Sequence, residues 1–331
     1  MAVSAAVLCG VGGCVPDSVV TNADLARRYD TSDEWIRSRT GIRQRHVVRA
    51  GEATSDIAVR AGAAALRSAG IHAVDAVVLA TSTPDHPCPA SAPTVARKLG
   101  LHEAAAFDLN AVCAGFVYAL AAATGLIATG MARTALVIGA DAFSTILDPA
   151  DRATAAVFGD GAGAVVLRAG GAGEPGAVLA CDLGSDGDLA ELIAVRAGGS
   201  RHPLVMGAPV SGGHFFAMHG KAVYRHAVRR MSASARAVLG RVGWRPPDVD
   251  CFVGHQANQR ILAAVGAEVG IAPERVFTNI ERVGNTAAAS IPLALTDAAA
   301  AGALRPGRRV LLTAFGGGAA WGSAALTWPE L

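Results

Sequence analysis

The feature that most constrains the fold is an internal similarity that recurs at one spacing along the chain. Three segments of the first half resemble three segments of the second at a common offset of 175: DAVV (75–78) and DCFV (250–253), RTALVI (133–138) and RRVLLT (308–313), NAVCAGFVYAL (110–120) and NTAAASIPLAL (285–295). One match of this kind is weak in an Ala- and Val-rich chain. Three matches at the same offset indicate two similar halves.

Both halves have the pattern of an α/β protein. Short apolar runs alternate with Ala-rich helical segments, and the clearest strands are VDAVVLAT (74–81), TALVIGA (134–140), AVVLRA (164–169), VDCFVGH (249–255) and RRVLLTAF (308–315). The segment RAGGAGEPGA (168–177) is rich in Gly and Pro, so it is the best candidate for the boundary between the halves. We therefore expect an N-terminal half over 1–170 and a C-terminal half over 171–331.

Local signals predict where several helices begin and end. Capping-box spacing predicts two helix starts and glycine predicts two helix stops: Thr21 with Asp24, Thr31 with Glu34, Gly70 and Gly130. The N-terminal MAVSAAVLCGVGGCVP lacks a basic segment and is interrupted by glycines. It therefore predicts a first strand and turn rather than a signal peptide.

Composition excludes several classes of protein. The 331 residues are 52% hydrophobic and 17% charged, and the net charge of +2 gives no electrostatic reason to expect nucleic acid as a partner. No apolar stretch reaches the length of a membrane span without a glycine or a charge. The six cysteines lie far apart without metal-ligand spacing, so we expect reduced thiols, no metal site and a cytoplasmic location.

Cys113, in NAVCAGF (110–116), is the first candidate for chemistry. It follows the strand-like AAAFDLN (104–110) and opens a long apolar helical run. Its sulfur is therefore expected where free N–H groups and the helix dipole favour an anion. Such a position can lower a thiol pKa from ~8.5 towards neutrality. The alternative is a buried, inert cysteine, which describes most free cysteines.

A histidine and an asparagine of the second half are the other candidates. His255, in VGHQANQRI, directly follows an expected strand, and the alternative is a structural or solvent-facing histidine. Asn285, in RVGNTAAASIP, precedes an expected helix, and the alternative is an ordinary N-cap. The offset makes Asn285 the counterpart of Asn110, so we expect the two helix openings to face each other across a pseudo-twofold axis.

One cleft would then hold a thiol, an imidazole and a carboxamide, which suit thioester chemistry. A thiolate attacks a thioester and forms an acyl-enzyme. Imidazole and carboxamide N–H groups stabilise the negative oxygen that develops on a second thioester. This chemistry needs no metal or redox cofactor.

Three glycine-rich stretches raise other hypotheses. CGVGGC (9–14) and FGDGAGA (158–164) suggest a dinucleotide-binding loop, but neither has G-x-G-x-x-G with a matching acidic residue downstream. AFGGGAAWG (314–322) follows the last expected strand. Its backbone N–H groups could complete an oxyanion hole, although the sequence alone favours a tight turn.

Four motifs resemble those of the β-ketoacyl-acyl-carrier-protein synthase III family: Cys113 in FDLNAVCAGF, His255 in GHQAN, Asn285 in GNTAAASIP, and the terminal AFGGGAAWGSAAL. Residues 21–46 and 148–164 resemble other segments of that family, so the likeness covers essentially the whole chain. It implies the thiolase fold, an α/β fold with duplicated βαβαβαββ halves in an α-β-α-β-α five-layer sandwich, and a homodimer.

The resemblance also implies a two-stage reaction. Cys113 would take the acyl group of an acyl-CoA. Malonyl-acyl carrier protein would then lose CO2, and its enolate would attack the acyl-enzyme. His255 and Asn285 would stabilise that enolate, and the N–H groups of Cys113 and Gly317 would hold the acyl oxyanion. Acyl-CoA is a substrate here, so no cofactor is implied.

Further residues receive roles by motif matching alone. Trp35 and Arg39 would sandwich the adenine of coenzyme A, because an aromatic face and a guanidinium both stack on a base; for Trp35 the alternative is a half-buried packing residue. The other implied residues are Thr31, Arg152, Gly220 and Lys221 for coenzyme A, Cys88, Phe158 and Phe315 for the acyl pocket, and Arg225 and Arg260 for the carrier protein.

Five positions depart from the family pattern. Cys88 stands where acetyl-specific members carry a Phe that closes the partner subunit's acyl pocket, so a longer or branched starter is expected. Ala267 and Glu268 replace lysines that meet the acidic carrier protein, Lys221 replaces an Asn near coenzyme A, and Gly254 replaces a Pro. Cys88 and the thinned basic patch favour a specialised pathway, such as polyketide starter selection, over fatty-acid initiation.

Two other functions compete with condensation. A related acyltransferase would move the acyl group to a hydroxyl, an amine or a carrier thiol without condensation, and Asn285 counts against it because that position varies in such relatives. A non-catalytic partner subunit of a condensing complex would typically lack the nucleophile, so Cys113 counts against that hypothesis.

Overall fold

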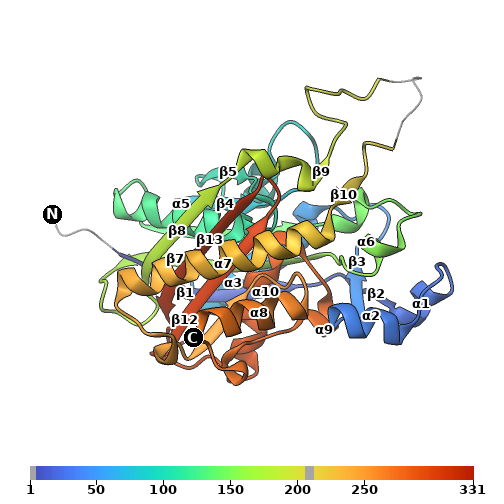
Figure 1. Ribbon diagram of the computed structural model, residues 1–331. Coiled ribbons are helices and arrows are strands. Elements are labelled where there is room, and N and C mark those ends of the chain that lie inside the picture. The colour runs from blue at the N-terminus through green and yellow to red at the C-terminus, as the bar shows by residue number, and fades with distance from the viewer. Residues whose placement is uncertain (1–4, 206–211) are drawn as a thin grey trace.

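Two mixed β-sheets organise the molecule, and each takes its strands from one half of the chain (Figure 1). The computed structural model describes residues 5–205 and 212–331. The first sheet has the order β1-β7-β6-β4-β5, with β1 Ala5–Cys14, β7 Gly161–Gly170, β6 Thr134–Asp141, β4 Ala76–Ala80 and β5 Ala105–Leu109. The second has the order β11-β12-β13-β8, with β11 Cys251–Gly254, β12 Arg309–Gly316, β13 Ala320–Thr327 and β8 Val178–Ser185.

The duplication is present in the register of the sheets. In the first sheet β4 pairs in parallel with β6, and Ala76 lies opposite Ala135. In the second β11 pairs in parallel with β12, and Cys251 lies opposite Val310, which is the same pair displaced by the repeat offset. The five strands expected from apolar runs are all confirmed. The second half differs in one respect, because the counterpart of β5 is reduced to a bridge between Phe252 and Val276.

Helices pack on both sheets and between them, which gives the expected α-β-α-β-α order of layers (Figure 1). One outer layer contains α3 Thr54–Ala69 and α4 Ala92–Lys98, the central layer contains α5 Gly115–Ala128 and α10 Ser290–Ala300, and the other outer layer contains α7 Gly220–Val242 and α8 Gln259–Val269. The shorter elements are β2 Ser18–Thr21, α1 Asn22–Ala26, α2 Asp33–Thr40, β3 Gln44–Val47, α6 Arg152–Ala155, β9 Ile193–Val195, β10 Phe216–Met218 and α9 Ile280–Val283, with 3-10 turns η1 Val112–Ala114, η2 Phe143–Ile146, η3 Gly187–Leu192, η4 Pro246–Asp248, η5 Pro273–Arg275 and η6 Ala287–Ala289.

Strand alternation explains why the sheets are covered on both faces. Side chains along a strand point alternately to opposite faces. In β4, Val77 and Leu79 pack in the cluster beneath α3, whereas Val78 and Ala80 pack against the central helices. These strands are buried on both faces, so they read as continuous apolar runs.

Glycines in β1 and β7 allow the helices to approach the first sheet closely. A Cβ on Gly12 would lie 2.3 Å from the Ala65 nitrogen of α3, and one on Gly163 would lie 2.5 Å from the Leu293 nitrogen of α10. CGVGGC and most of FGDGAGA are therefore strand segments, and the dinucleotide-loop hypothesis is wrong.

An inserted hairpin and two short helices, spanning Ser18–Val47, confirm one predicted cap and correct another. Thr21 and Asp24 form the expected capping box of α1. The expected box of Thr31 and Glu34 is wrong, because Ser32 caps α2 by accepting a hydrogen bond from the Trp35 N–H at 3.1 Å. Gly70 ends α3 in the left-handed conformation, and Gly130 has positive φ just beyond α5.

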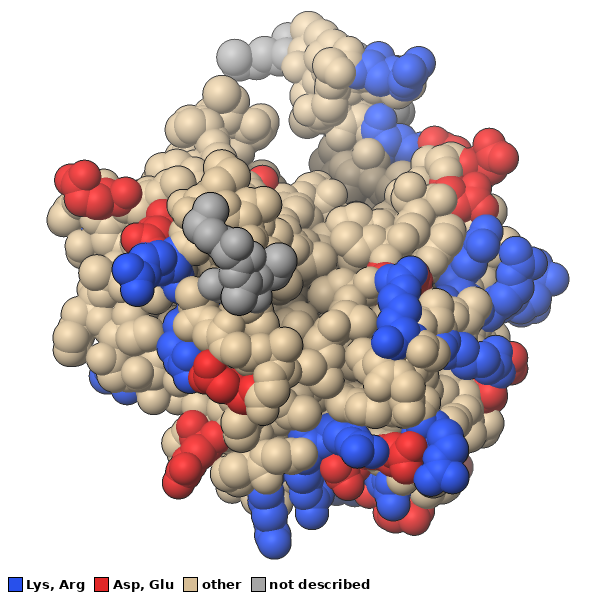
Figure 2. Space-filling model, turned by 90° about the vertical axis from the view of Figure 1, so that its left-hand side faces the viewer, with Lys and Arg blue, Asp and Glu red and all other residues tan. Residues whose placement is uncertain are grey.

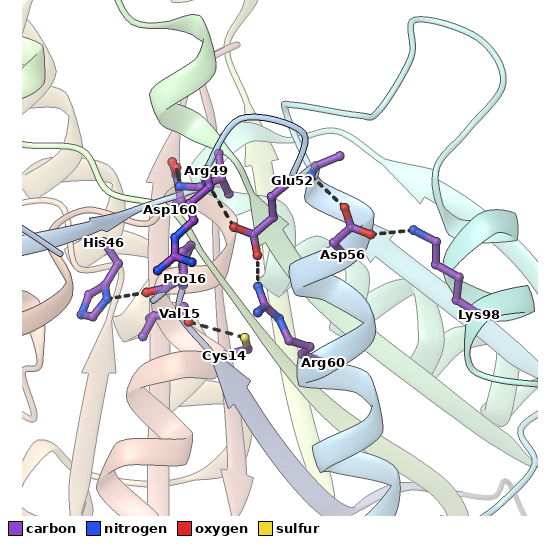
Figure 3. Close-up of polar contacts among 12 residues, drawn as sticks. Cys14, Val15, Pro16, His46, Arg49, Glu52, Asp56, Arg60, Lys98 and Asp160 are labelled. Carbon is purple, nitrogen blue, oxygen red and sulfur yellow. Dashed lines mark hydrogen bonds and ion pairs between the residues drawn. The ribbon is translucent and has the colours of Figure 1, made fainter. Parts of the chain in front are cut away.

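Ion pairs fix the first turns of α3 to its surroundings (Figure 3). Glu52, before the helix, pairs with Arg60, and Asp56 pairs with Lys98 of α4 at 2.7 Å. These charges are partly exposed, so each pair adds little to the free energy of unfolding. The apolar cluster beneath α3, not these pairs, packs the helix on the sheet.

The charges on one face of the molecule are mixed in sign. In Figure 2, Lys and Arg side chains are interspersed with Asp and Glu, and much of the middle of this face is uncharged. No helix within residues 5–205 and 212–331 has the length and apolar character needed to cross a membrane. All six cysteines are free thiols, and the described residues contain no His, Cys, Asp and Glu cluster suited to a metal ion.

The close contact between the halves makes a testable prediction at Gly139 of β6, where an added Cβ would lie 2.3 Å from the Ala288 carbonyl oxygen. Gly139→Ala is expected to lower the free energy of unfolding by about 1–3 kcal/mol. The added methyl group would meet a backbone carbonyl, which cannot move aside as a flexible side chain can. Gly125→Ala is the matched control, since nothing lies within 4 Å of its Cβ position in α5, and it should gain about 0.5–1 kcal/mol. Urea unfolding measures both. A wild-type midpoint for Gly139→Ala would contradict the packing.

Candidate active site

Cys113 lies in the 3-10 turn η1, directly before α5. Val112 has φ of 48°, a left-handed conformation that a valine rarely adopts. The Asn110 side chain stabilises this turn, because its Oδ1 accepts the Val112 N–H at 3.1 Å. The turn leaves Cys113 only 8% exposed.

Asn285 opens an equivalent turn in the second half. Ala287 has φ of 46°, and its N–H donates to the Asn285 Oδ1 at 3.0 Å. The backbone of Asn285 is also held, by the Val157 oxygen and the Gly159 nitrogen at 2.9 Å each. Since Oδ1 is engaged by η6, the amide nitrogen is the group that Asn285 can present to a substrate.

The two turns pack across the boundary between the halves. η1 lies against β12, and η6 lies against β6. Gly316, at the end of β12, is so close that an added Cβ would lie 2.7 Å from the Cys113 nitrogen. Within the described residues, the Cys113 N–H donates to no other group, so it is free to bind an oxyanion.

His255 follows β11, and its N–H donates to the Thr313 oxygen of β12 at 2.8 Å. This contact places His255 beside β12, the strand that ends at Gly316. Burial lowers the pKa of His255 to about 3, so the imidazole is neutral at ordinary pH. Its Nδ1 is buried without a partner among the described residues, and no carboxylate orients the ring there. A neutral imidazole can donate one hydrogen bond to a developing oxyanion.

The expectation of a lowered thiol pKa is wrong for this structure. Burial raises the pKa of Cys113, and the carboxylate of Asp141 raises it further. Desolvation disfavours the thiolate and outweighs the turn at the helix opening. The free protein therefore holds Cys113 as a thiol.

Aromatic side chains surround Cys113. Phe158 stacks on Phe143 with ring centroids 4.4 Å apart, and Phe216 meets both rings edge-on. All three belong to the buried cluster that contains Cys113. Phe216 also lines a cavity of about 820 Å³, together with Met218 of β10 and polar groups nearer the surface. Phe216 and Met218 thus belong both to the lining of this cavity and to the surroundings of Cys113.

Phe315 lies elsewhere. It is buried beneath α7 in the outer cluster of the second half. Its position therefore adds no support to a role in the acyl pocket. Cys88 is exposed in a loop before α4 and lies outside the buried clusters of this single chain.

Trp35 lies on α2 with two guanidinium groups over its ring. The Arg39 Cζ is 4.5 Å from the ring centroid and the Arg152 Cζ is 5.3 Å from it. The structure thus brings together three of the residues expected to bind coenzyme A, the adenine pair Trp35 and Arg39 and, with them, Arg152. Thr31 precedes α2 and its hydroxyl is buried without a partner among the described residues.

The remaining expected binding residues lie on two helices of the second half. Gly220 and Lys221 are at the exposed start of α7, and Arg225 is exposed one turn later. Arg260 of α8 donates to the Ser38 oxygen of α2 at 2.7 Å. This bond joins the helix that carries Arg260 to the helix that carries Trp35.

Sequence reasoning missed four residues beside the trio. Gly316 and Asp141 contact the two turns, and Phe143 and Phe216 complete the aromatic cluster. Asp141 and Gly316 occupy equivalent positions in the repeat, so the repeat offset could have indicated both residues. No pattern in the sequence indicated the aromatic pair.

Comparisons with known proteins agree with this site. Residues 107–187 match the family model for 3-oxoacyl-[acyl-carrier-protein (ACP)] synthase III, and residues 239–328 match the model for its C-terminal part. The chain is 57% identical to β-ketoacyl-[acyl-carrier-protein] synthase III 5 of Streptomyces coelicolor over 99% of this chain and 98% of that protein.

Solved structures extend the comparison. The crystal structure of 3-oxoacyl-(acyl carrier protein) synthase III from Pseudomonas aeruginosa PAO1 has a TM-score of 0.92 and 54% identity, and 99% of each chain is covered. The priming β-ketosynthase from the R1128 polyketide biosynthetic pathway has a TM-score of 0.91 and 33% identity, covering 98% of this chain and 96% of that one.

The raised pKa of Cys113 predicts how the free protein reacts with iodoacetamide. Because the thiol is protonated, alkylation of Cys113 should keep accelerating above pH 8 and show no plateau near neutrality. Peptide mass mapping after timed alkylation from pH 6 to pH 10 measures this, with exposed Cys88 as the internal reference for the reagent. A plateau below pH 7 would show that the helix opening outweighs burial.

Proposed function

This chain belongs to the β-ketoacyl-[acyl-carrier-protein] synthase III family, and from that premise we propose how its residues carry out the condensation. The protein is a condensing acyltransferase of the thiolase fold. It uses acyl-CoA and malonyl-acyl carrier protein as substrates. The observation that carries the residue assignments is the meeting of η1, η6 and β12, which joins Cys113, Asn285 and the strand beside His255.

In the first stage the Cys113 sulfur attacks the acyl-CoA thioester. The carbon–sulfur bond to Cys113 forms and the bond to coenzyme A breaks. The thiol proton ends on the departing coenzyme A sulfur. The free Cys113 N–H and the Gly317 N–H stabilise the acyl oxyanion. Gly317 follows Gly316, the residue that contacts the Cys113 nitrogen.

In the second stage malonyl-acyl carrier protein replaces coenzyme A. Loss of CO2 leaves an enolate, whose oxygen accepts hydrogen bonds from the His255 imidazole and the Asn285 amide nitrogen. The enolate carbon then attacks the acyl-enzyme, and Cys113 is released as the thiol after taking up a proton. Thiol, imidazole and amide groups account for every step, so the proposal includes no cofactor.

Coenzyme A would bind where Trp35, Arg39 and Arg152 lie together. In the free chain both guanidinium groups lie over the indole ring, so the adenine base would displace at least one of them. Thr31, Gly220 and Lys221 are proposed contacts at the same entrance. Because Arg260 bonds to α2, it would meet the carrier protein beside this nucleotide site, with Arg225 as a second contact.

We also propose a homodimer that joins at β5. This strand is the edge of the first sheet and, among the described strands, pairs only with β4. Its Phe107 is 38% exposed, and an apolar edge strand is suited to pairing with a second copy. A dimer would also give the exposed Cys88 a place in a pocket shared between subunits, beside Phe158.

The proposal also includes the division of the chain into halves 1–170 and 171–331, and a cytoplasmic location.

The proposed function makes separate predictions for the two stages, acylation of Cys113 and discharge of the acyl group by malonyl-acyl carrier protein. Intact-protein mass should show one acyl adduct after incubation with acyl-CoA, mapped to Cys113, and malonyl-acyl carrier protein should remove it as β-ketoacyl carrier protein. Asn285→Ala should still form the adduct but lose discharge by about 10²–10³-fold, as for removal of an oxyanion donor. Cys113→Ala should form no adduct. Loading without discharge in the wild type would favour the plain acyltransferase.

A second prediction concerns the acyl starter. The small Cys88 should leave room for longer or branched acyl groups, so the wild type should load butyryl- or isobutyryl-CoA better than acetyl-CoA. Cys88→Phe should reverse that order, and Cys88→Ser, of similar size, should keep it. The values of kcat/KM for the three thioesters measure the effect. Wild-type preference for acetyl-CoA would refute the open pocket and the specialised pathway that it favours.

A further inference from the structure

Asp141, at the end of β6, is a carboxylate that the reaction described above does not use. It is 0% exposed. One carboxylate oxygen accepts hydrogen bonds from the Thr81 hydroxyl at 3.2 Å, the Ser82 N–H at 2.7 Å and the Thr83 hydroxyl at 3.1 Å. The other oxygen accepts the Ala288 N–H at 2.9 Å. Each of these donors is uncharged, and a buried carboxylate without a cation is costly.

The bond to Ala288 crosses from the first half to the second. Ala288 is the middle residue of η6, the turn that Asn285 opens. The first two N–H groups of this turn are thus both engaged, Ala287 by the Asn285 Oδ1 at 3.0 Å and Ala288 by Asp141. Val157 and Gly159 hold the backbone of Asn285 itself. Asp141 supplies a side-chain hydrogen bond from the first half to η6, the turn that binds the Asn285 Oδ1 and so directs its amide.

The repeat shows what this contact replaces. Displaced by the repeat offset, Asp141 corresponds to Gly316 and Cys113 corresponds to Ala288. At the working site, the glycine leaves the Cys113 N–H free. At the equivalent place in the other half, a carboxylate oxygen occupies the position in which an oxyanion would bind, and it takes the Ala288 N–H. One half therefore keeps an oxyanion hole, and the other fills its counterpart with Asp141.

We propose that Asp141 is a positioning residue for the decarboxylation and condensation stage. It holds η6 against β6 so that the Asn285 amide nitrogen faces the enolate. This inference rests on the proposed function and adds a residue to it. The turn that carries Cys113, η1, is held by Asn110 and Gly316 and, in the described part of the chain, has no hydrogen bond to Asp141. Loss of the Asp141 contact should therefore leave Cys113 in place for its attack on acyl-CoA.

The test is to compare the two stages in Asp141→Asn. The amide keeps the shape of the carboxylate. Its single oxygen should turn to the three donors of Thr81, Ser82 and Thr83, which leaves the NH₂ group facing the Ala288 N–H, from which it cannot accept a hydrogen bond. Acylation of Cys113 by acyl-CoA should be no slower than in the wild type, whereas discharge by malonyl-acyl carrier protein should fall by about tenfold or more, as when an oxyanion donor is misplaced. Both rates come from intact-protein mass over time on the same sample.

Two variants support this comparison. Asp75→Asn is the matched control, since Asp75 likewise accepts hydrogen bonds from uncharged groups, three of them from Arg133 and Thr134 at the other end of β4, away from η6. It should leave the ratio of the two rates unchanged. Asp141→Ser, whose hydroxyl is too short to reach Ala288, should show the same selective loss as Asp141→Asn and serves if that variant is poorly folded. Partial unfolding lowers both rates by one factor and cannot imitate a change in their ratio.

A second measurement separates the effect of Asp141 on the position of η6 from the effect of its charge on Cys113. The Asp141 charge raises the pKa of Cys113, so Asp141→Asn should shift iodoacetamide alkylation of Cys113 to lower pH while discharge slows. A more reactive thiol combined with slower condensation supports the proposal. Equal loss of both stages, or loss of neither, would overturn it. If the wild type loads but never condenses, the proposed function fails instead, and the variant need not be measured.

Discussion

The site depends on one packing arrangement, in which each helix-opening turn lies against a strand of the other half. η1 packs on β12 and η6 packs on β6, so Cys113 and Asn285 meet although they lie in different halves of the chain. The contact is possible because glycine stands in both strands, Gly139 against the Ala288 oxygen and Gly316 against the Cys113 nitrogen. A side chain at either position would separate the turns. The chemistry of the site is therefore a property of the junction between the halves.

Duplication followed by divergence explains the asymmetry of this junction. Both halves keep the same turn, with an asparagine accepting the N–H two residues later and that later residue in the left-handed conformation. The chemistry differs because the thiol occurs in one turn, opposite Gly316, while Ala288 and Asp141 occupy the equivalent places in the other. His255 likewise has Ala80 as its counterpart, a core residue. The turn of the first half, η1, carries the reactive thiol, and the equivalent turn of the second half, η6, positions Asn285 beside it.

Much of this could be predicted from the sequence, since the repeat offset and the apolar runs are local patterns. They predicted the strands and the facing of the two turns, and the family resemblance implied the order of the layers. Three things could not be predicted, each because it depends on how the folded chain places a side chain. The raised pKa of Cys113 follows from desolvation, which a helix-start pattern does not reveal. The position of Phe315 under α7 depends on which face of β12 it occupies. The cap of α2 moved from Thr31 to Ser32 because the serine hydroxyl, not the threonine, reaches the free N–H group.

The most direct test of the central claim is a high-resolution crystal structure of the acyl-enzyme. If the junction of the halves builds the site, the acyl carbonyl oxygen on Cys113 should lie about 2.7–3.1 Å from the Cys113 nitrogen, in the space that Gly316 leaves open. The Asn285 amide nitrogen should face the acyl group. An acyl oxygen directed away from Gly316, with the Cys113 N–H bonded to a protein group, would contradict the account.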